Sequence, residues 1–91
     1  MLEMTEVYQL DDNIILKSIN NSFWALDTRL GGQYKLNSVS YEILDRINGK
    51  DSLQDIFDSL LRNYNVSEED CYVDFSEFIQ KSINKNIIIK K

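Results

Sequence analysis

The sequence predicts an α+β fold in which a three-stranded antiparallel sheet is followed by three helices. Residues 14–36 carry short β-branched and aromatic segments that alternate in polarity and are separated by Asn or Gly turns. Residues 38–85 carry apolar residues at helical spacing behind polar capping residues. The 91 residues include no proline and no low-complexity linker, so we expect one domain over residues 1–91.

The N-terminal third predicts a short arm and then a meander of strands. Residues 1–12 are of mixed polarity and predict a partly ordered arm. A first strand is expected at Ile14 to Ile19, and Asn20-Asn21 suits a two-residue hairpin turn because asparagine tolerates positive φ. Residues 23–28 and, after a turn, residues 33–36 complete a sheet with two unpaired edges.

The first two predicted helices each begin at a capping residue. Residues 38–48 form the first, with Asn37 or Ser38 as its N-cap and Gly49 as the left-handed residue that ends it. The second runs from Asp51 or Ser52 to about residue 64. Ser52, followed three residues later by Asp55, fits a capping box.

The third predicted helix opens with Ser67 and reaches about residue 85. Acidic residues fill its first turn and lysines its last, as the helix dipole favours. Asn86 then suits a left-handed cap, and the β-branched run Ile87 to Ile89 predicts a last short strand or a wing.

Composition excludes several classes of protein. A net charge of −5 and a pI of about 4.5 argue against nucleic acid as a partner. The sequence has no histidine, no phosphate-binding glycine loop and one cysteine, so we expect no enzyme activity, no cofactor and no metal site. It has no secretory signal pattern and no apolar run near the ~20 residues of a membrane span. We therefore expect a cytoplasmic binding module with no membrane partner.

Two short motifs have competing interpretations. Asp51-Ser52-Leu53 matches the tripeptide that carries phosphopantetheine in acyl carrier proteins, but Ser52 is better explained as a helix cap, since carrier proteins are all-helical. Cys71 has no basic neighbour in sequence to lower its pKa, which favours a structural thiol over a nucleophile.

The third helix carries the pattern that most suggests a binding surface. Its apolar residues cover a band wider than one packing face requires. One edge of that band, with Cys71, Phe75, Phe78 and Ser82, could line a groove whose other wall is the edge of the strand at 33–36. The alternative is that the whole band is core or a dimer contact.

The order and spacing of several motifs resemble the PqqD family over residues 14–90. The motifs are Tyr34-x-Leu36-Asn37, Asn48-Gly49, Ser52-Leu53-x-x-Ile56, Tyr64-x-Val66 and Phe75-x-x-Phe78-Ile79. The resemblance implies a winged-helix-like fold and the function of a RiPP recognition element, which binds the leader of a ribosomally made precursor peptide and presents it to a modifying enzyme. Ser82 stands where the family commonly has leucine, and Asn86 where it commonly has glycine.

The resemblance also implies which residues and partners take part. In the family the leader adds as a strand to the third strand and packs on the third helix. The implied peptide-binding residues here are Leu30, Gln33, Tyr34, Lys35, Leu36, Cys71, Asp74, Phe75, Phe78 and Ser82. The implied partners are a precursor leader and a maturation enzyme, either a radical SAM enzyme or a leader peptidase, acting on a quinone cofactor precursor, a lasso peptide or another modified peptide. We expect a monomer or weak dimer, and a carrier protein modified at Ser52 or a small dimerisation module remain the alternatives.

Overall fold

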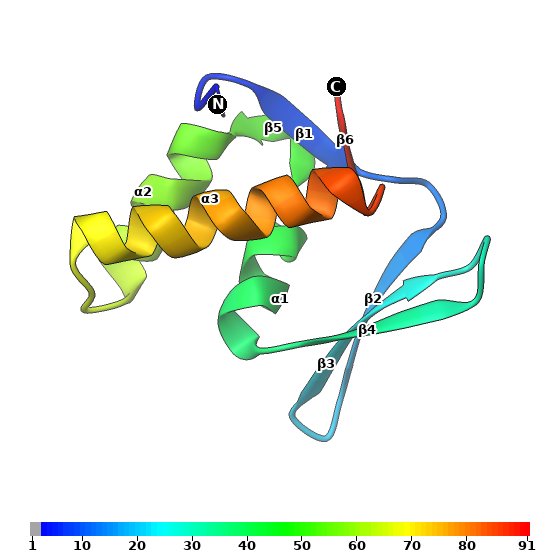
Figure 1. Cartoon of the computed structure of the whole chain (residues 1–91). Coiled ribbons are helices and arrows are strands. Elements are labelled where there is room, and N and C mark those ends of the chain that lie inside the picture. The colour runs from blue at the N-terminus through cyan, green and yellow to red at the C-terminus, as the bar shows by residue number, and fades with distance from the viewer. Residues whose placement is uncertain (1–2) are drawn as a thin grey trace.

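The computed structural model describes residues 3–91, which form two small antiparallel sheets and three helices (Figure 1). The elements are β1 Val7–Leu10, β2 Ile14–Ile19, β3 Ser22–Asp27, β4 Gly32–Leu36, α1 Ser38–Asp45, β5 Asn48–Ser52, α2 Leu53–Asn63, α3 Glu68–Asn84 and β6 Ile88–Lys90. The predicted α+β class, with three helices and an antiparallel three-stranded sheet, is confirmed.

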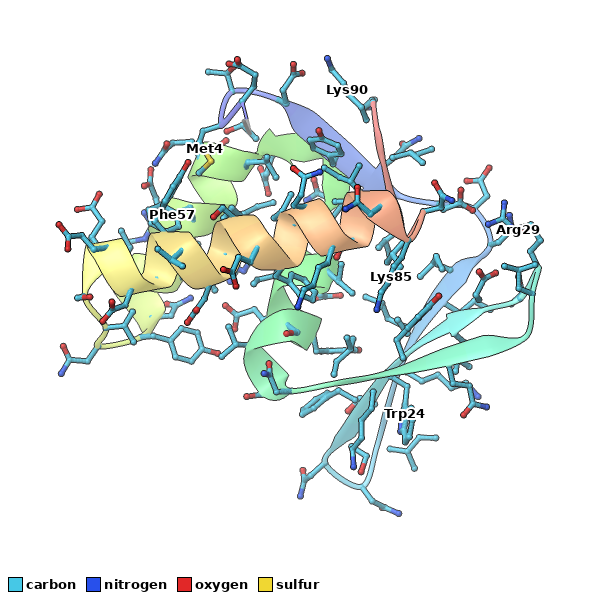
Figure 2. The ribbon with its side chains drawn as sticks, in the orientation of Figure 1. Met4, Trp24, Arg29, Phe57, Lys85 and Lys90 are labelled. Atoms are coloured by element: carbon cyan, nitrogen blue, oxygen red, sulfur yellow. The ribbon has the colours of Figure 1, made fainter. Side chains whose placement is uncertain are left out.

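The predicted meander is the sheet β2-β3-β4. Asn20 and Asn21 join β2 to β3 with φ of 50° and 65°, the two positive values that a tight hairpin turn requires. Opposite Tyr34 in the register lies Ala25, which is fully buried, so this face of the sheet packs on the helices. The other face is turned away from the helices and carries Trp24 (Figure 2).

The turn between β3 and β4 is built around a buried carboxylate. Asp27 is 3% exposed, and its Oδ1 accepts hydrogen bonds from the backbone N–H groups of Arg29 and Leu30. Gly31 supplies the left-handed residue, with φ of 75°, and its N–H donates to the Asp27 carbonyl. These bonds fix where β4 begins, and so fix which side chains of β4 face the helices.

The structure corrects the expectation of a partly ordered N-terminal arm. Within this segment, residues 1 and 2 lie outside the described residues, but Val7–Leu10 is strand β1, the centre of a second sheet of order β5-β1-β6. Its partners are polar or very short strands far along the chain, which is why its weak alternation did not identify it. The Lys91 ammonium, directly after β6, donates a hydrogen bond to the Gly49 carbonyl of β5 at 2.8 Å and so links the two outer strands of this sheet.

The structure also corrects the end of the first helix. α1 ends at Asp45, with Arg46 as its C-cap, and Gly49 lies instead in β5. Gly49 does have the predicted positive φ, 77°, but it uses this conformation where β5 bulges against β1. Asn48 supports the bulge, since its side-chain oxygen accepts from the N–H groups of Lys50 and Asp51.

The remaining helix ends agree with the sequence. Ser52 and Asp55 form the predicted reciprocal capping box on α2, and the Ser67 hydroxyl accepts from the Asp70 N–H at the start of α3. Asn86, with φ of 59°, is the left-handed residue after α3, and the strand predicted near residue 87 is β6.

All three helices and both sheets contribute to one core. Its buried apolar residues are Ile14, Ala25, Ile43, Leu44, Ile47, Leu53, Ile56, Phe57, Leu60, Phe75, Ile79, Ile87 and Ile88. Phe57 of α2 packs against the ring of Phe75 on α3, with ring centroids 5.5 Å apart. In the described part of the chain, no helix combines the length and the apolar character needed to cross a bilayer.

Candidate functional site

Strand β4 presents an unpaired edge. In the order β2-β3-β4 it pairs only with β3 among residues 3–91, so half of its backbone N–H and C=O groups have no strand partner. Tyr34 and Leu36 are half-buried on the helix side, while Gln33 and Lys35 are exposed on the other. The edge therefore offers main-chain hydrogen bonds beside a partly apolar face.

Helix α3 forms a second wall that runs antiparallel to β4 (Figure 1). Its C-terminal end reaches the strand directly, because the Lys85 ammonium lies 5.2 Å from the centroid of the Tyr34 ring. Figure 2 shows Lys85 pointing from the end of the helix toward the sheet. Followed back from this contact toward its N-terminus, α3 passes the end of β4 and then the start of α1 (Figure 1).

Between α3, α1 and the end of α2 lies a cavity of about 430 Å³. Its deepest side chains, Ile43, Leu60 and Phe75, belong to the core, and half-buried Phe78 and Cys71 form its sides. The other lining residues are Asn37, Val39, Ser40, Tyr64, Val66, Asp70, Asp74, Glu77 and Lys81. A volume of this size has room for large apolar side chains, and the rim above them is charged. We call β4, this cavity and the C-terminal half of α3 the groove.

The thiol in the groove is held in its neutral form. Partial burial raises the pKa of Cys71, and the nearby Asp74 carboxylate raises it further by repelling a thiolate. A nucleophilic cysteine needs the opposite environment. The sequence-based interpretation of Cys71 as a structural thiol fits this environment.

Most of the predicted peptide-binding residues lie along the groove. Cys71, Asp74, Phe75 and Phe78 line the cavity together. Tyr34 and Leu36 face the helices from β4, and Tyr34 touches α3 through Lys85.

Other predicted residues lie apart from the cavity. Leu30 is 76% exposed in the turn between β3 and β4. Gln33 and Lys35 point away from the helices, and the Lys35 ammonium lies 5.8 Å from the Trp24 ring centroid. Ser82 is only 2% exposed, and its hydroxyl donates to the Phe78 carbonyl, so its side chain is part of the core here.

Sequence reasoning missed the part of the cavity that α1 contributes. The predicted peptide-binding residues include none from residues 37–49, yet Asn37, Val39, Ser40 and Ile43 line the cavity. Helix α1 starts directly after β4, which places its first turn under α3. The available signal was Val39, an apolar residue in the exposed first turn of a helix.

Residues 3–91 contain no group of three or more His, Cys, Asp or Glu side chains placed to hold a metal ion. The Ser52 hydroxyl accepts a hydrogen bond from the Asp55 N–H at 3.2 Å and thereby caps α2. The groove is thus the feature of the described chain with the clearest binding geometry.

Comparison with known proteins gives one family and two similar structures. The family described as "Coenzyme PQQ synthesis protein D (PqqD)" matches residues 23–88. No protein with curated annotation matches significantly.

Two solved structures have the same fold. One is TbiB1 in complex with the TbiA(beta) leader peptide: 19% identity and a TM-score of 0.77, covering 88% of this chain and 93% of that one. The other is lasso peptide synthetase B1 complexed with the leader peptide: 21% identity and a TM-score of 0.78, covering 90% of this chain and 96% of that one.

Proposed function

Since the chain belongs to the PqqD family, we propose that it is a non-catalytic recognition protein that captures the leader of a ribosomally made precursor peptide and presents it to a modifying enzyme. Both structurally similar proteins are described in complex with leader peptides. The observation that carries the proposal is the unpaired edge of β4 beside an apolar cavity under α3.

The proposed mechanism is strand addition. An extended leader segment hydrogen-bonds to the free edge of β4, and an apolar side chain of the same segment enters the cavity. Ordering a disordered leader costs about 2–5 kcal/mol, so we expect a net binding free energy of about −8 to −9 kcal/mol, which is a micromolar to sub-micromolar Kd.

The modifying enzyme benefits because the bound leader is tethered. Holding the precursor near the enzyme raises the effective concentration of the segment to be modified without new contacts at the active site. We propose a radical SAM enzyme or a leader peptidase as this partner and the cytoplasm as the compartment. A lasso peptide is the product class that we favour, because one of the two similar structures is a lasso peptide synthetase B1.

The first test is a titration followed by amide NMR. The probe is the leader of a short precursor encoded beside this chain's gene, next to a maturation enzyme. Residues 30–37 of the β4 side and residues 70–82 of α3 are expected to shift together. Shifts confined to α2, or a gene neighbourhood without a precursor, would count against the proposal.

A matched pair of variants on α3 tests the cavity. Phe78→Asp places a charge at the half-buried wall of the cavity and should weaken leader binding at least about tenfold. Val73→Asp makes the same change on the same helix, at a side chain that is 52% exposed and does not line the cavity, and should bind normally. Circular dichroism establishes that both variants are folded, and equal affinities would contradict the assigned wall.

Of the two alternatives, dimerisation has an observation in its favour. The face of the β2-β3-β4 sheet away from the helices exposes Ile15 and Ile19, which are 47% and 53% accessible. A mass that rises with concentration in sedimentation, with no peptide partner, would favour this function. The carrier-protein alternative loses support, because Ser52 is engaged in a capping box and the fold contains two sheets.

A further inference from the structure

Along the groove, acidic side chains lie at one end and basic side chains at the other. Asp70, Asp74 and Glu77 of α3 rim the cavity, and Lys81 rims it one turn later. Lys85 stands over Tyr34 at the other end. The groove therefore has an acidic end beyond β4 and a basic end beside β4.

Helix stabilisation explains only part of this arrangement. An acidic residue is favoured within the first turn of a helix, which accounts for Asp70, and a lysine is favoured within the last. Asp74 and Glu77 lie beyond the first turn, where the dipole effect has faded. The helix dipole therefore does not account for Asp74 and Glu77.

These rim charges are also unpaired. The ion pairs found within residues 3–91 join Arg29 to Asp27, Arg46 to Glu42 and Lys90 to Glu6, and none of them involves the groove. The carboxylate of Asp74 acts on the thiol beside it, since it raises the pKa of Cys71. Charges that are free and clustered at one end of an apolar cavity favour a ligand of opposite sign there.

The directions of β4 and α3 determine the order of charges that a bound peptide would need. β4 runs toward Asn37, which lines the cavity, so the acidic end lies past the C-terminal end of β4. A strand added antiparallel, the slightly more stable pairing, has its own N-terminal side at that end. Its C-terminal side then passes Lys81 and Lys85.

We propose that the groove selects a leader segment with a fixed charge order: basic residues before its apolar anchor and acidic residues after it. This inference rests on the proposed function, because it specifies the peptide that the same groove takes. The unpaired Asp74 and Glu77 at one end, and Lys81 and Lys85 at the other, set the direction and register of the peptide.

The test begins with selection of 12-residue peptides from a random display library against the purified chain. Enriched sequences are expected to carry Lys or Arg on the N-terminal side of an aromatic or aliphatic residue and Asp or Glu on the C-terminal side. One selected peptide is then compared with an isomer of the same composition in which the acidic and basic residues are exchanged. At low salt the isomer should bind about tenfold more weakly, and the difference should shrink as salt is added.

Two double variants with the same change in net charge provide the control. Asp74→Asn with Glu77→Gln should remove most of the discrimination between the two isomers. Glu68→Gln with Glu69→Gln should leave it unchanged, because these side chains are on α3 but lie away from the cavity. Equal effects of the two pairs would mean that only overall charge matters, and would overturn the inference.

The outcomes separate this inference from the proposed function. Selected peptides that shift residues 30–37 and 70–82 without a charge order, or with the reverse order, would overturn the inference and leave the groove as the binding site. Failure of any peptide to perturb these two segments would overturn both.

Discussion

The Lys85 ammonium lies 5.2 Å from the centroid of the Tyr34 ring and so joins the end of α3 to the edge strand β4. This cation–π contact links the two walls of the groove directly, at the end opposite the cavity. It holds the helix beside an edge whose backbone groups remain available for a peptide.

Replacing Lys85 with Met should therefore loosen this end of the groove. The change keeps the apolar stem but removes the cation, and at an exposed site this should lower the free energy of unfolding by about 0.5–1 kcal/mol. Tyr34→Phe retains the aromatic face and should have little effect, whereas Tyr34→Leu should act like Lys85→Met. Urea denaturation of the single and double variants measures the coupling, and a double variant that is simply the sum of the two singles would contradict the contact.

The pH dependence of Cys71 alkylation should report its surroundings. Because burial and the Asp74 carboxylate both disfavour the thiolate, the pKa is raised, and the alkylation rate should reach its half-maximum at a higher pH than for free cysteine. Asp74→Asn should move this pH down, while Asp58→Asn on α2 should not. The rates follow from iodoacetamide labelling read by mass spectrometry, and an Asp74→Asn profile identical to that of the parent protein would refute the assigned cause.

Ser52→Ala should destabilise the fold through its capping box. The hydroxyl accepts from the Asp55 N–H, and its loss leaves a helix donor unpaired, at a cost of about 1 kcal/mol. Ser52→Asp retains a cap and should cost less. Ser38→Ala, at the first residue of α1 where Asn37 is the cap, should change little. Urea midpoints compare the three variants, and the hypothesis fails if Ser38→Ala is the most harmful.

Alanine substitutions at the three glycines should distinguish the cost of backbone strain from the cost of crowding. Gly49 has φ of 77°, and a Cβ there would lie 3.3 Å from the Gln9 amide oxygen and 3.4 Å from Lys91 Cδ. Gly31 has φ of 75° but open space around it, and at Gly32 the nearest atoms are 3.9 Å away. Substitution by Ala should therefore cost about 1–2 kcal/mol at Gly31 for the left-handed backbone alone, more at Gly49, where crowding adds to it, and least at Gly32. Thermal unfolding of the three variants checks this order.

The sequence was informative wherever structure depends on neighbours in the chain. Asn20-Asn21 fixed the hairpin, alternation fixed the faces of β3 and β4, and Ser52 and Ser67 marked two helix starts, because each of these is a local effect. The second sheet escaped prediction because its pairing is long-range. β5 has the sequence Asn-Gly-Lys-Asp-Ser, which lacks any strand preference and is held extended by backbone bonds to β1.

The groove, too, was predicted only where it depends on residue spacing within one element. The wide apolar band of α3 predicted Cys71, Phe75 and Phe78 at the cavity, since helical spacing alone places them on adjacent faces. The lining from α1 and α2 depends on how three helices cross, which spacing within one helix does not determine. Gly49 was predicted to have a positive φ, but the same conformation serves a helix end or a strand bulge, and sequence did not distinguish them.

The position of β1 at the centre of the second sheet has a consequence for how the chain folds. Tyr8 pairs with Lys90, almost the full length of the sequence away, while the hairpins of the other sheet join close neighbours. Local hairpins form within microseconds, but long-range pairings wait until a large loop closes. On the ribosome, β2 to β4 can therefore pair early, whereas β6 docks only after residues 88–90 have emerged. Since β6 directly follows α3, the α3 wall of the groove is held in place only after the sheet β2-β3-β4 has been able to form.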